Sequence, residues 1–209
     1  MLASRDVDVA ITHAPAAEEA FLAAHPAWRY TKVMFNDFVL VGPVGDPADV
    51  KRAPTVAIAM RRIAVSGERF ISRGDSSGTH EREESLWKDA GSRPAADRLV
   101  IAGAGMGATL RAASETGAYT LTDRATFAQH VDGLALVPLF EGAAEFMNTY
   151  AVITNPDAPG ARIAASFAGW LTNGDGRTVI EGFQIRSGVP AFRPWPLSRP
   201  RSAPSDTPQ

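Results

Sequence analysis

Residues 70–90 read FISRGDSSGTHEREESLWKDA, a short apolar strand followed by a polar turn and an amphipathic helix. Gly74 and Gly78 lie in the turn, where a backbone without side chains can approach a ligand closely. A helix that begins directly after a buried strand presents unpaired backbone N–H groups and the positive end of its dipole. This stretch therefore predicts a strand, a turn and a helix of an α/β protein, with the turn suited to an anion.

Charged and hydroxyl side chains accompany these amides in the same turn. Ser77 and Thr79 supply hydroxyl donors, and Arg73 supplies a permanently charged guanidinium. Asp75 is close enough in the chain to orient that guanidinium. In the alternative interpretation, Ser77 or Thr79 only caps the helix, and Arg73 and Asp75 form an ordinary surface pair.

A second glycine-rich turn lies in IAGAGMGATL, residues 101–110, again between an expected strand and an expected helix. Gly103, Gly105 and Ala108 fit the dinucleotide fingerprint G-x-G-x-x-A, and Asp123 follows about 20 residues later, where a ribose-binding acid is expected. An NAD-dependent oxidoreductase is therefore the alternative function. Two points weigh against it: the fingerprint lies in the middle of a short chain, and the other anion turn would have no role.

The rest of the chain continues the alternation of strands and helices. Expected strands cover residues 7–12, 31–41, 70–72, 99–102, 119–121, 134–139 and 146–154, and expected helices cover residues 16–24, 55–64, 78–90, 107–115, 125–130, 161–171 and 177–183. Alternation of this kind predicts a parallel sheet. The long apolar strands 31–41 and 146–154 bracket the alternating block and predict two crossings between lobes. In helix 161–171 the apolar stripe predicts four core positions, Ile163, Phe167, Trp170 and Leu171.

The composition excludes several classes of protein. The chain has 209 residues, a formal net charge of −2 and no cysteine. A basic nucleic-acid binder, a disulfide framework, thiol catalysis and zinc–thiolate or iron–sulfur sites are therefore not expected. No apolar run approaches the ~18 residues that a membrane helix needs, so we expect no direct membrane insertion. The start, MLASRDVDVAI, lacks the basic and apolar regions of a secretory signal, so a genuine start at Met1 would keep the chain in the cytoplasm.

Four motifs occur in a fixed order along the chain: MFNDFVLVGPVGDPADV (34–50), SRGDSSGTHEREESLWKDAG (72–91), GAGMGATLRAASETGAYTLTDRATF (103–127) and FMNTYAVITNP (146–156). Together they closely resemble the substrate-binding proteins of tungstate ABC importers, over about residues 6–194. The resemblance implies a two-lobed periplasmic binding protein of type II, in the α/β class, with parallel sheets and strands that cross between the lobes. In that family the oxyanion lies in the cleft between the lobes.

The resemblance also implies a division of the chain. Residues 1–42 and 147–193 would form lobe I, residues 43–146 would form lobe II with both anion loops, and residues 194–209 would be a disordered tail. The family has further strands, helices and ligands in the first part of lobe I, so we expect lobe I to be incomplete. We therefore expect this chain to bind its ion far more weakly than an intact homologue.

Carried over residue by residue, the family's ligands are Arg73, Ser77, Gly78 and Thr79, with Gly107 and Thr109 as a second donor group and Asp75 as the residue that orients Arg73. These residues would bind tungstate first and molybdate next, with no catalytic residue, metal or cofactor. The implied partner is the transmembrane permease subunit of the importer, and the implied location is periplasmic or extracellular. Both ions are fully deprotonated at neutral pH, so their site should offer donors only.

Overall fold

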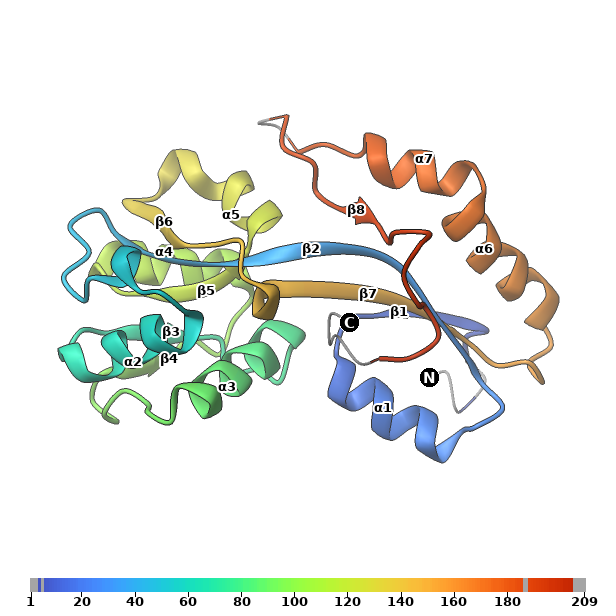
Figure 1. The fold of residues 1–209 in the computed structure, drawn as a ribbon, viewed down its shortest axis with the longest axis horizontal. Helices are drawn as coiled ribbons and strands as arrows, with labels where there is room; N and C mark the ends of the chain where they lie inside the picture. The colour runs from blue at the N-terminus through green and yellow to red at the C-terminus, as the bar shows by residue number, and fades with distance from the viewer. Residues whose placement is uncertain (1–3, 5, 186–187, 205–209) are drawn as a thin grey trace. The chain divides into compact units, whose positions relative to one another are not determined.

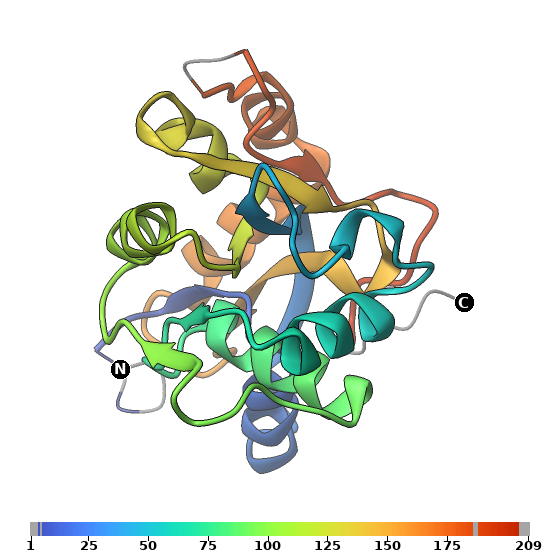
Figure 2. The ribbon, with the colours of Figure 1, turned by 90° about the vertical axis from the view of Figure 1, so that its left-hand side faces the viewer.

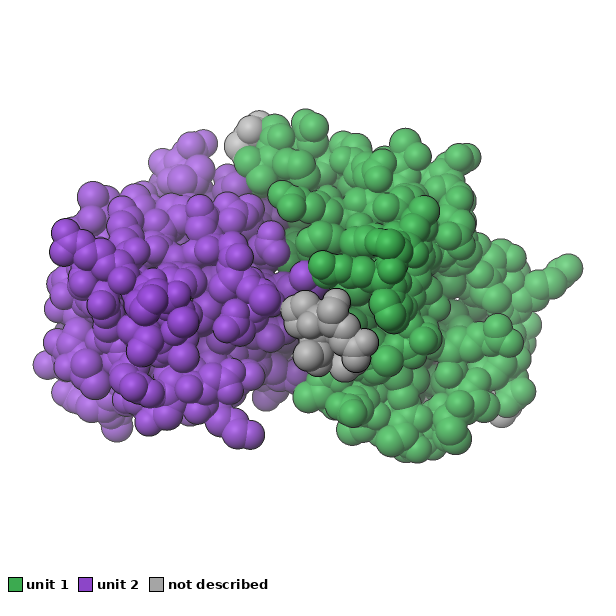
Figure 3. Space-filling model, in the orientation of Figure 1, with its two compact units in different colours: residues 1–36, 148–209 green, residues 37–147 purple. Residues whose placement is uncertain are grey.

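The computed structural model describes residue 4, residues 6–185 and residues 188–204. The chain divides into two compact units, coloured separately in Figure 3. Unit 1 comprises Met1–Asn36 and Asn148–Gln209, and unit 2 comprises Asp37–Met147. The sequence predicts boundaries after residues 42 and 146, whereas the structure places them after residues 36 and 147.

Two long strands continue from one unit into the other. Strand β2 (Arg29–Pro43) crosses the first boundary, and strand β7 (Met147–Thr154) crosses the second. Nine of the 15 residues of β2 and six of the eight residues of β7 are buried, which agrees with the long apolar segments in their sequences. Figure 1 shows β7 beside β2, in agreement with their pairing in one sheet.

Unit 2 alternates short strands with helices. In chain order, its elements are η1 (Val50–Arg52), α2 (Val56–Ser66), β3 (Phe70–Ser72), α3 (Gly78–Ala90), β4 (Leu99–Ile101), α4 (Met106–Thr116), β5 (Thr120–Asp123), α5 (Arg124–His130), η2 (Val131–Gly133), β6 (Leu136–Phe140) and η3 (Ala144–Phe146). Helices α2 and α3 pack side by side, as both ribbon views show (Figures 1 and 2).

Local signals account for the ends of these helices. The Thr55 hydroxyl caps α2 by accepting from the Ile58 N–H, and the Asp123 carboxylate caps α5 by accepting from the Thr126 N–H. Helix α3 ends where Gly91 adopts the left-handed conformation, with φ of 61°. Helix α3 therefore has the bounds that the sequence predicts.

The strands of unit 2 are mixed in direction. Strand β3 pairs with β4 in parallel, with Phe70 opposite Leu99, and Tyr119 also bridges in parallel to Phe70. Strand β2 instead runs antiparallel to β5 and to β6. The expected parallel sheet is thus correct for the strands joined by helical crossovers and wrong for β2. A strand that arrives from the other unit has no crossover helix to set its direction.

An apolar core fills unit 2 between its helices and strands. Phe70 and Trp87 meet edge to face with ring centroids 5.0 Å apart, and Met60 and Ile63 of α2 belong to the same cluster. A second cluster lies around Leu110 of α4. Strand β3 has all three residues buried, so the turn that follows it begins from a rigid position.

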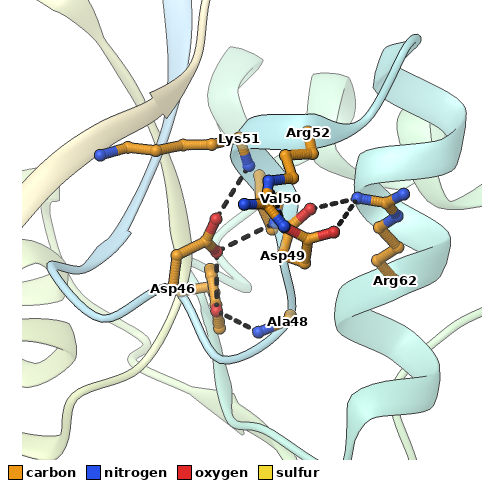
Figure 4. Close-up of polar contacts among 8 residues, drawn as sticks. Asp46, Ala48, Asp49, Val50, Lys51, Arg52 and Arg62 are labelled. Atoms are coloured by element: carbon orange, nitrogen blue, oxygen red, sulfur yellow. Dashed lines mark hydrogen bonds and ion pairs between the residues drawn. The ribbon is translucent and has the colours of Figure 1, made fainter.

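A polar network holds the loop that connects β2 with α2 (Figure 4). Asp46 has a left-handed φ of 42°, and its carboxylate accepts from the N–H groups of Val50 (3.0 Å) and Lys51 (2.9 Å). The Tyr119 hydroxyl donates to the Asp46 carboxylate (3.1 Å) and accepts from the Ala48 N–H (2.9 Å). These bonds attach the loop to the buried Tyr119 and so stabilise unit 2.

Unit 1 contains β1 (Val9–Thr12), α1 (Pro15–Ala24), parts of β2 and β7, α6 (Ala161–Asn173), α7 (Asp175–Gly182) and β8 (Arg193–Pro194). Strand β7 lies between β1 and β2, and β8 pairs with β2. The β1–β7 pair is antiparallel, with Ala10 opposite Ile153. The described residues contain no helix that is both long enough and apolar enough to cross a membrane.

The predicted core stripe of α6 requires a correction. Leu171 is buried and Phe167 packs against the core, but Ile163 is 73% exposed and Trp170 is 42% exposed. The buried face is instead centred on Ala164 and Leu171. It is therefore rotated around the helix axis by about one residue relative to the predicted stripe. Trp170 stacks along the helix on Phe167, with ring centroids 5.9 Å apart.

The prediction of a disordered tail is wrong for residues 194–204, while residues 205–209 lie outside the described part of the chain. Trp195 is buried, and its ring contacts Phe35 edge to face and lies 4.6 Å from Lys32 Nζ. Its indole N–H donates to the Pro200 carbonyl (3.0 Å). One buried tryptophan therefore anchors a segment whose proline-rich composition is typical of disorder.

Candidate functional site

The predicted anion turn lies between β3 and α3, as expected from residues 70–90. We call residues 73–79 the anion loop. Its last part forms the first turn of α3, where the Ser77 hydroxyl accepts from the His80 N–H at 3.4 Å. Ser77 is therefore the N-cap, as the alternative interpretation expects. A serine hydroxyl that accepts through its oxygen still has its own hydrogen to donate.

Two residues of the anion loop have left-handed backbones. Gly74 has φ of 61° and Ser76 has φ of 54°. A Cβ at Gly74 would overlap the Cγ2 methyl of Ile101, so only glycine fits this position without a shift of the Ile101 side chain. The loop is thus sharply folded, and its shape depends on glycine at residue 74.

Arg73 and Asp75 form an ion pair within the loop, through Arg73 Nη2 and Asp75 Oδ2. The other oxygen of Asp75 accepts from the Ser77 N–H at 3.2 Å. Partial burial alone would raise the pKa of Asp75, but the hydrogen bonds from Ser77 and the nearby Arg73 lower it below its ordinary value. Asp75 is therefore ionised at neutral pH and holds both Arg73 and the start of α3.

Several donors of the anion loop have no hydrogen-bond partner among the described residues. Arg73 Nε is buried without a hydrogen bond to any described residue, and the Arg73 side chain is only 19% exposed. No described acceptor is paired with the N–H groups of Gly78 and Thr79, which precede the first hydrogen-bonded amides of α3. A buried guanidinium N–H in the same loop as two such amides at a helix N-terminus is suited to an anion.

The second glycine-rich turn is joined to the anion loop by backbone hydrogen bonds. The Ala102 N–H donates to the Ser72 carbonyl (2.8 Å), and the Gly103 N–H donates to the Arg73 carbonyl (3.0 Å). These bonds continue the parallel β3–β4 pairing past the ends of both strands. The structure therefore brings the two predicted turns together at the carboxyl ends of neighbouring strands, where α/β proteins place their ligands.

The two residues predicted as donors on the second turn have different environments. Gly107 lies in the first turn of α4, and a Cβ there would come within 3.0 Å of His130 Nε2. Thr109 is fully buried, and its hydroxyl donates to the carbonyls of Ala104 (3.4 Å) and Gly105 (3.3 Å). The expectation that Thr109 offers a free hydroxyl is therefore corrected, because this hydroxyl already stabilises its own helix turn.

The dinucleotide interpretation assigned Asp123 to a ribose. In the structure the Asp123 carboxylate accepts from the Thr126 N–H at 2.9 Å and caps α5. Its strand, β5, pairs with β2 and not with β4, which precedes the glycine-rich turn. The residues of the fingerprint are therefore not arranged as a dinucleotide site. The described residues also contain no group of three or more His, Asp or Glu side chains that could hold a metal ion.

Two residues beside the anion loop were not predicted from the sequence. His80 Nδ1 accepts from the Ser76 N–H at 3.1 Å. Glu83 is buried one turn further along α3 and accepts from Trp87 Nε1 at 3.2 Å. The sequence could have indicated His80, because it lies three residues after the Ser77 N-cap. Glu83 had no such signal, because its burial depends on tertiary packing around α3.

Burial raises the pKa of the Glu83 carboxyl above its ordinary value, and the hydrogen bond from Trp87 does not cancel this. The folded chain then binds more protons than the unfolded chain between the ordinary pKa of Glu83 and its raised folded value. The free energy of unfolding must fall as the pH rises through this window.

We therefore expect Glu83→Gln, which retains an acceptor for Trp87, to stabilise the protein above this window and to flatten its pH dependence. Urea midpoints at pH 5 and pH 8 test this expectation. The control is Asp89→Asn, an exposed position on the same helix. Parallel pH profiles for the wild type and Glu83→Gln would show that Glu83 does not contribute.

The fold and the site define a class of protein. Two compact α/β units linked by two long strands, with an anion loop at a helix N-terminus, are the organisation of a periplasmic binding protein. The family model of the PBP superfamily domain matches residues 1–175.

Individual relatives narrow this class. The chain is 38% identical over 196 residues to the tungstate-binding protein TupA of Peptoclostridium acidaminophilum, covering 90% of this chain and 68% of that protein. It is 31% identical over 189 residues to the tungstate-binding protein TupA of Campylobacter jejuni, covering 86% of this chain and 70% of that protein. The solved structure of the tungstate-binding protein TupA from Desulfovibrio alaskensis G20 is 39% identical, with a TM-score of 0.79 over 91% of this chain and 80% of that chain. The chain therefore belongs to the PBP superfamily, in the family of these tungstate-binding proteins.

Proposed function

We propose that this chain is the solute-binding component of an ABC importer and that its anion loop binds tungstate, with molybdate next in preference. The observation that carries the proposal is the buried Arg73 Nε, which has no hydrogen bond to a described residue and lies in the same loop as the unpaired amides of Gly78 and Thr79. The names of the relatives support the choice of ion. Gly107 is a further donor on the adjoining turn.

The chemistry of Asp75 supports a fully deprotonated oxyanion. Hydrogen phosphate carries a proton that needs an acceptor, whereas tungstate and molybdate need donors only. Asp75 is the carboxylate within the anion loop, and both of its oxygens already accept from Ser77 and Arg73. Its lowered pKa keeps it ionised, so it has no proton to donate, and both of its oxygens are engaged by Ser77 and Arg73 within the loop. We therefore expect phosphate to bind less well than tungstate.

The proposed role is transport and not catalysis. The donors of the anion loop bind and release an ion without forming or breaking a covalent bond. The partner that we propose is the transmembrane permease of the importer, and the proposed location is periplasmic or extracellular, as in the family. Tungstate is cargo in this role, and we propose no resident metal or cofactor.

Titration of the 15N-labelled chain with tungstate, molybdate, sulfate and phosphate at constant ionic strength tests this proposal. We expect tungstate and molybdate to shift the amide resonances of Gly78 and Thr79 and the Nε resonance of Arg73, with saturation at lower concentrations than sulfate or phosphate. A dissociation constant in the nanomolar range requires ~12 kcal/mol of binding free energy. The few charge-assisted bonds of one loop give ~1.5–3 kcal/mol each, so we expect binding to be much weaker than nanomolar. Equal shifts with all four ions, or shifts confined to other residues, would contradict the proposal.

A further inference from the structure

His80 connects the anion loop to the body of α3. Its Nδ1 accepts from the backbone N–H of Ser76 (3.1 Å), while its own backbone N–H donates to the Ser77 hydroxyl (3.4 Å). The side chain therefore holds the residue before the N-cap, and the backbone holds the N-cap itself. No other described side chain forms a hydrogen bond with the Ser76 N–H.

The orientation of the imidazole is set from its other side. Because Nδ1 accepts a hydrogen bond, the hydrogen of the neutral ring must be on Nε2. His80 Nε2 lies 3.4 Å from Glu84 Oε1. Arg93 in turn holds Glu84 through two parallel bonds of 2.7 Å. The ring is thus held between Ser76 and Glu84, and neither of its nitrogens is available to donate to an anion.

The Ser76 backbone needs such support. A left-handed φ in a residue other than glycine costs about 1–2 kcal/mol, and Ser76 has φ of 54°. Ser76 is directly followed by Ser77 and Gly78, so its backbone angles determine the direction in which the first amides of α3 point. Without an acceptor for the Ser76 N–H, the left-handed φ of Ser76 would be less stable. The amides of Gly78 and Thr79 would then have to be ordered when the anion binds.

We propose that His80 is a positioning residue of the anion loop, which acts by accepting the Ser76 N–H and so orders the amides of Gly78 and Thr79 before the anion binds. The proposal rests on the proposed function of that loop. His80 acts through Ser76 and not as a ligand, since the lone pair of Nδ1 would repel an oxyanion. The benefit is preorganisation, which increases affinity without adding a contact to the ion.

Two substitutions at His80 separate this role from a general role in helix stability. In His80→Asn the amide oxygen can occupy the place of Nδ1 and accept from Ser76, but the side chain is too short to reach Glu84. In His80→Gln the amide extends to the place of Nε2 and can contact Glu84, but it does not place an acceptor at Ser76. Glutamine has the higher helix propensity, so helix stability alone predicts that His80→Gln is the milder change. The proposal predicts the reverse.

Two measurements on the full chain decide between these outcomes. In the ion-free protein, hydrogen exchange of the Ser76 amide should remain slow in the wild type and in His80→Asn, and should become about tenfold faster in His80→Gln and His80→Leu. Tungstate affinity, measured by the same amide titration, should stay within about twofold of the wild type in His80→Asn and fall about fivefold to tenfold in the other two variants.

The possible results have distinct meanings. If the wild type binds tungstate and His80→Asn and His80→Gln behave alike in both measurements, His80 is not a positioning residue. The same conclusion follows if His80→Gln is the milder variant. If the wild type does not bind tungstate, the proposed function fails, and the exchange pattern of the Ser76 amide still supports or overturns the role of His80 in ordering the loop.

Discussion

Replacement of Arg73 by alanine should reduce the affinity for tungstate about 10- to 150-fold, which corresponds to the loss of one charged hydrogen-bonding partner at ~1.5–3 kcal/mol. The guanidinium is the positive side chain of the anion loop, and its Nε is buried without another described partner. The substitution also leaves Asp75 without its counterion beside the incoming dianion, which adds repulsion. Calorimetry or the amide titration measures the change.

Arg73→Lys and a remote arginine serve as the comparisons. Lysine keeps the charge but lacks the planar fork that contacts Asp75 while presenting Nε, so we expect an affinity between those of the wild type and Arg73→Ala. Arg52, which is 84% exposed and also pairs with an aspartate in unit 2, is the matched control. Unchanged affinity in Arg73→Ala, or an equal loss in Arg52→Ala, would show that Arg73 does not bind the ion.

Replacement of Gly74 by alanine should lower the free energy of unfolding by about 2–4 kcal/mol. Alanine in the left-handed region costs about 1 kcal/mol, and forcing a methyl group into an occupied space costs typically 1–3 kcal/mol more. At Gly74 both apply, since φ is 61° and a Cβ would overlap the Cγ2 methyl of Ile101. Urea unfolding monitored by far-ultraviolet circular dichroism provides the measurement.

Two further glycines separate the causes of this loss. Gly103 is also left-handed, with φ of 57°, but a Cβ there would meet open space, so Gly103→Ala reports the cost of the backbone angle alone. Gly45 has neither restriction, and Gly45→Ala should be nearly neutral. Ile101→Ala removes the Cγ2 methyl and should recover part of the loss when combined with Gly74→Ala. Equal stability in Gly74→Ala and Gly103→Ala would mean that the contact with Ile101 relaxes at no cost.

Helix α3 and its preceding turn were predictable because the signals for them are local. The Ser77 cap, the left-handed stop at Gly91 and the buried β3 all act within a few residues of the position that they determine. The same is true of Arg73 and Asp75, which are close enough in the chain that any tight turn brings them together. The relation to tungstate-binding proteins was also visible, since it depends on four ordered motifs and not on three-dimensional contacts.

Other features depended on contacts between distant segments. Trp195 anchors the C-terminal segment because it packs against Phe35 and Lys32, more than 150 residues earlier, and composition does not record such a contact. The direction of β2 relative to β5 is likewise set by its path between the two units. The predicted disorder and the predicted parallel sheet were wrong at these places for that reason.

The amino-acid sequence by itself determined the family, the position of the anion loop and the residue types that it offers, because turns, caps and charge patterns are properties of neighbouring residues. Only the tertiary structure decided which of these donors remain unpaired. It buries Thr109 and uses its hydroxyl within α4, whereas it leaves Arg73 Nε without a described partner. It also places the His80 ring between Ser76 and Glu84. Hydrogen bonding and burial depend on the atoms that surround a group in space. Many of these atoms belong to segments that are distant along the chain, and the sequence alone does not show that such segments are in contact.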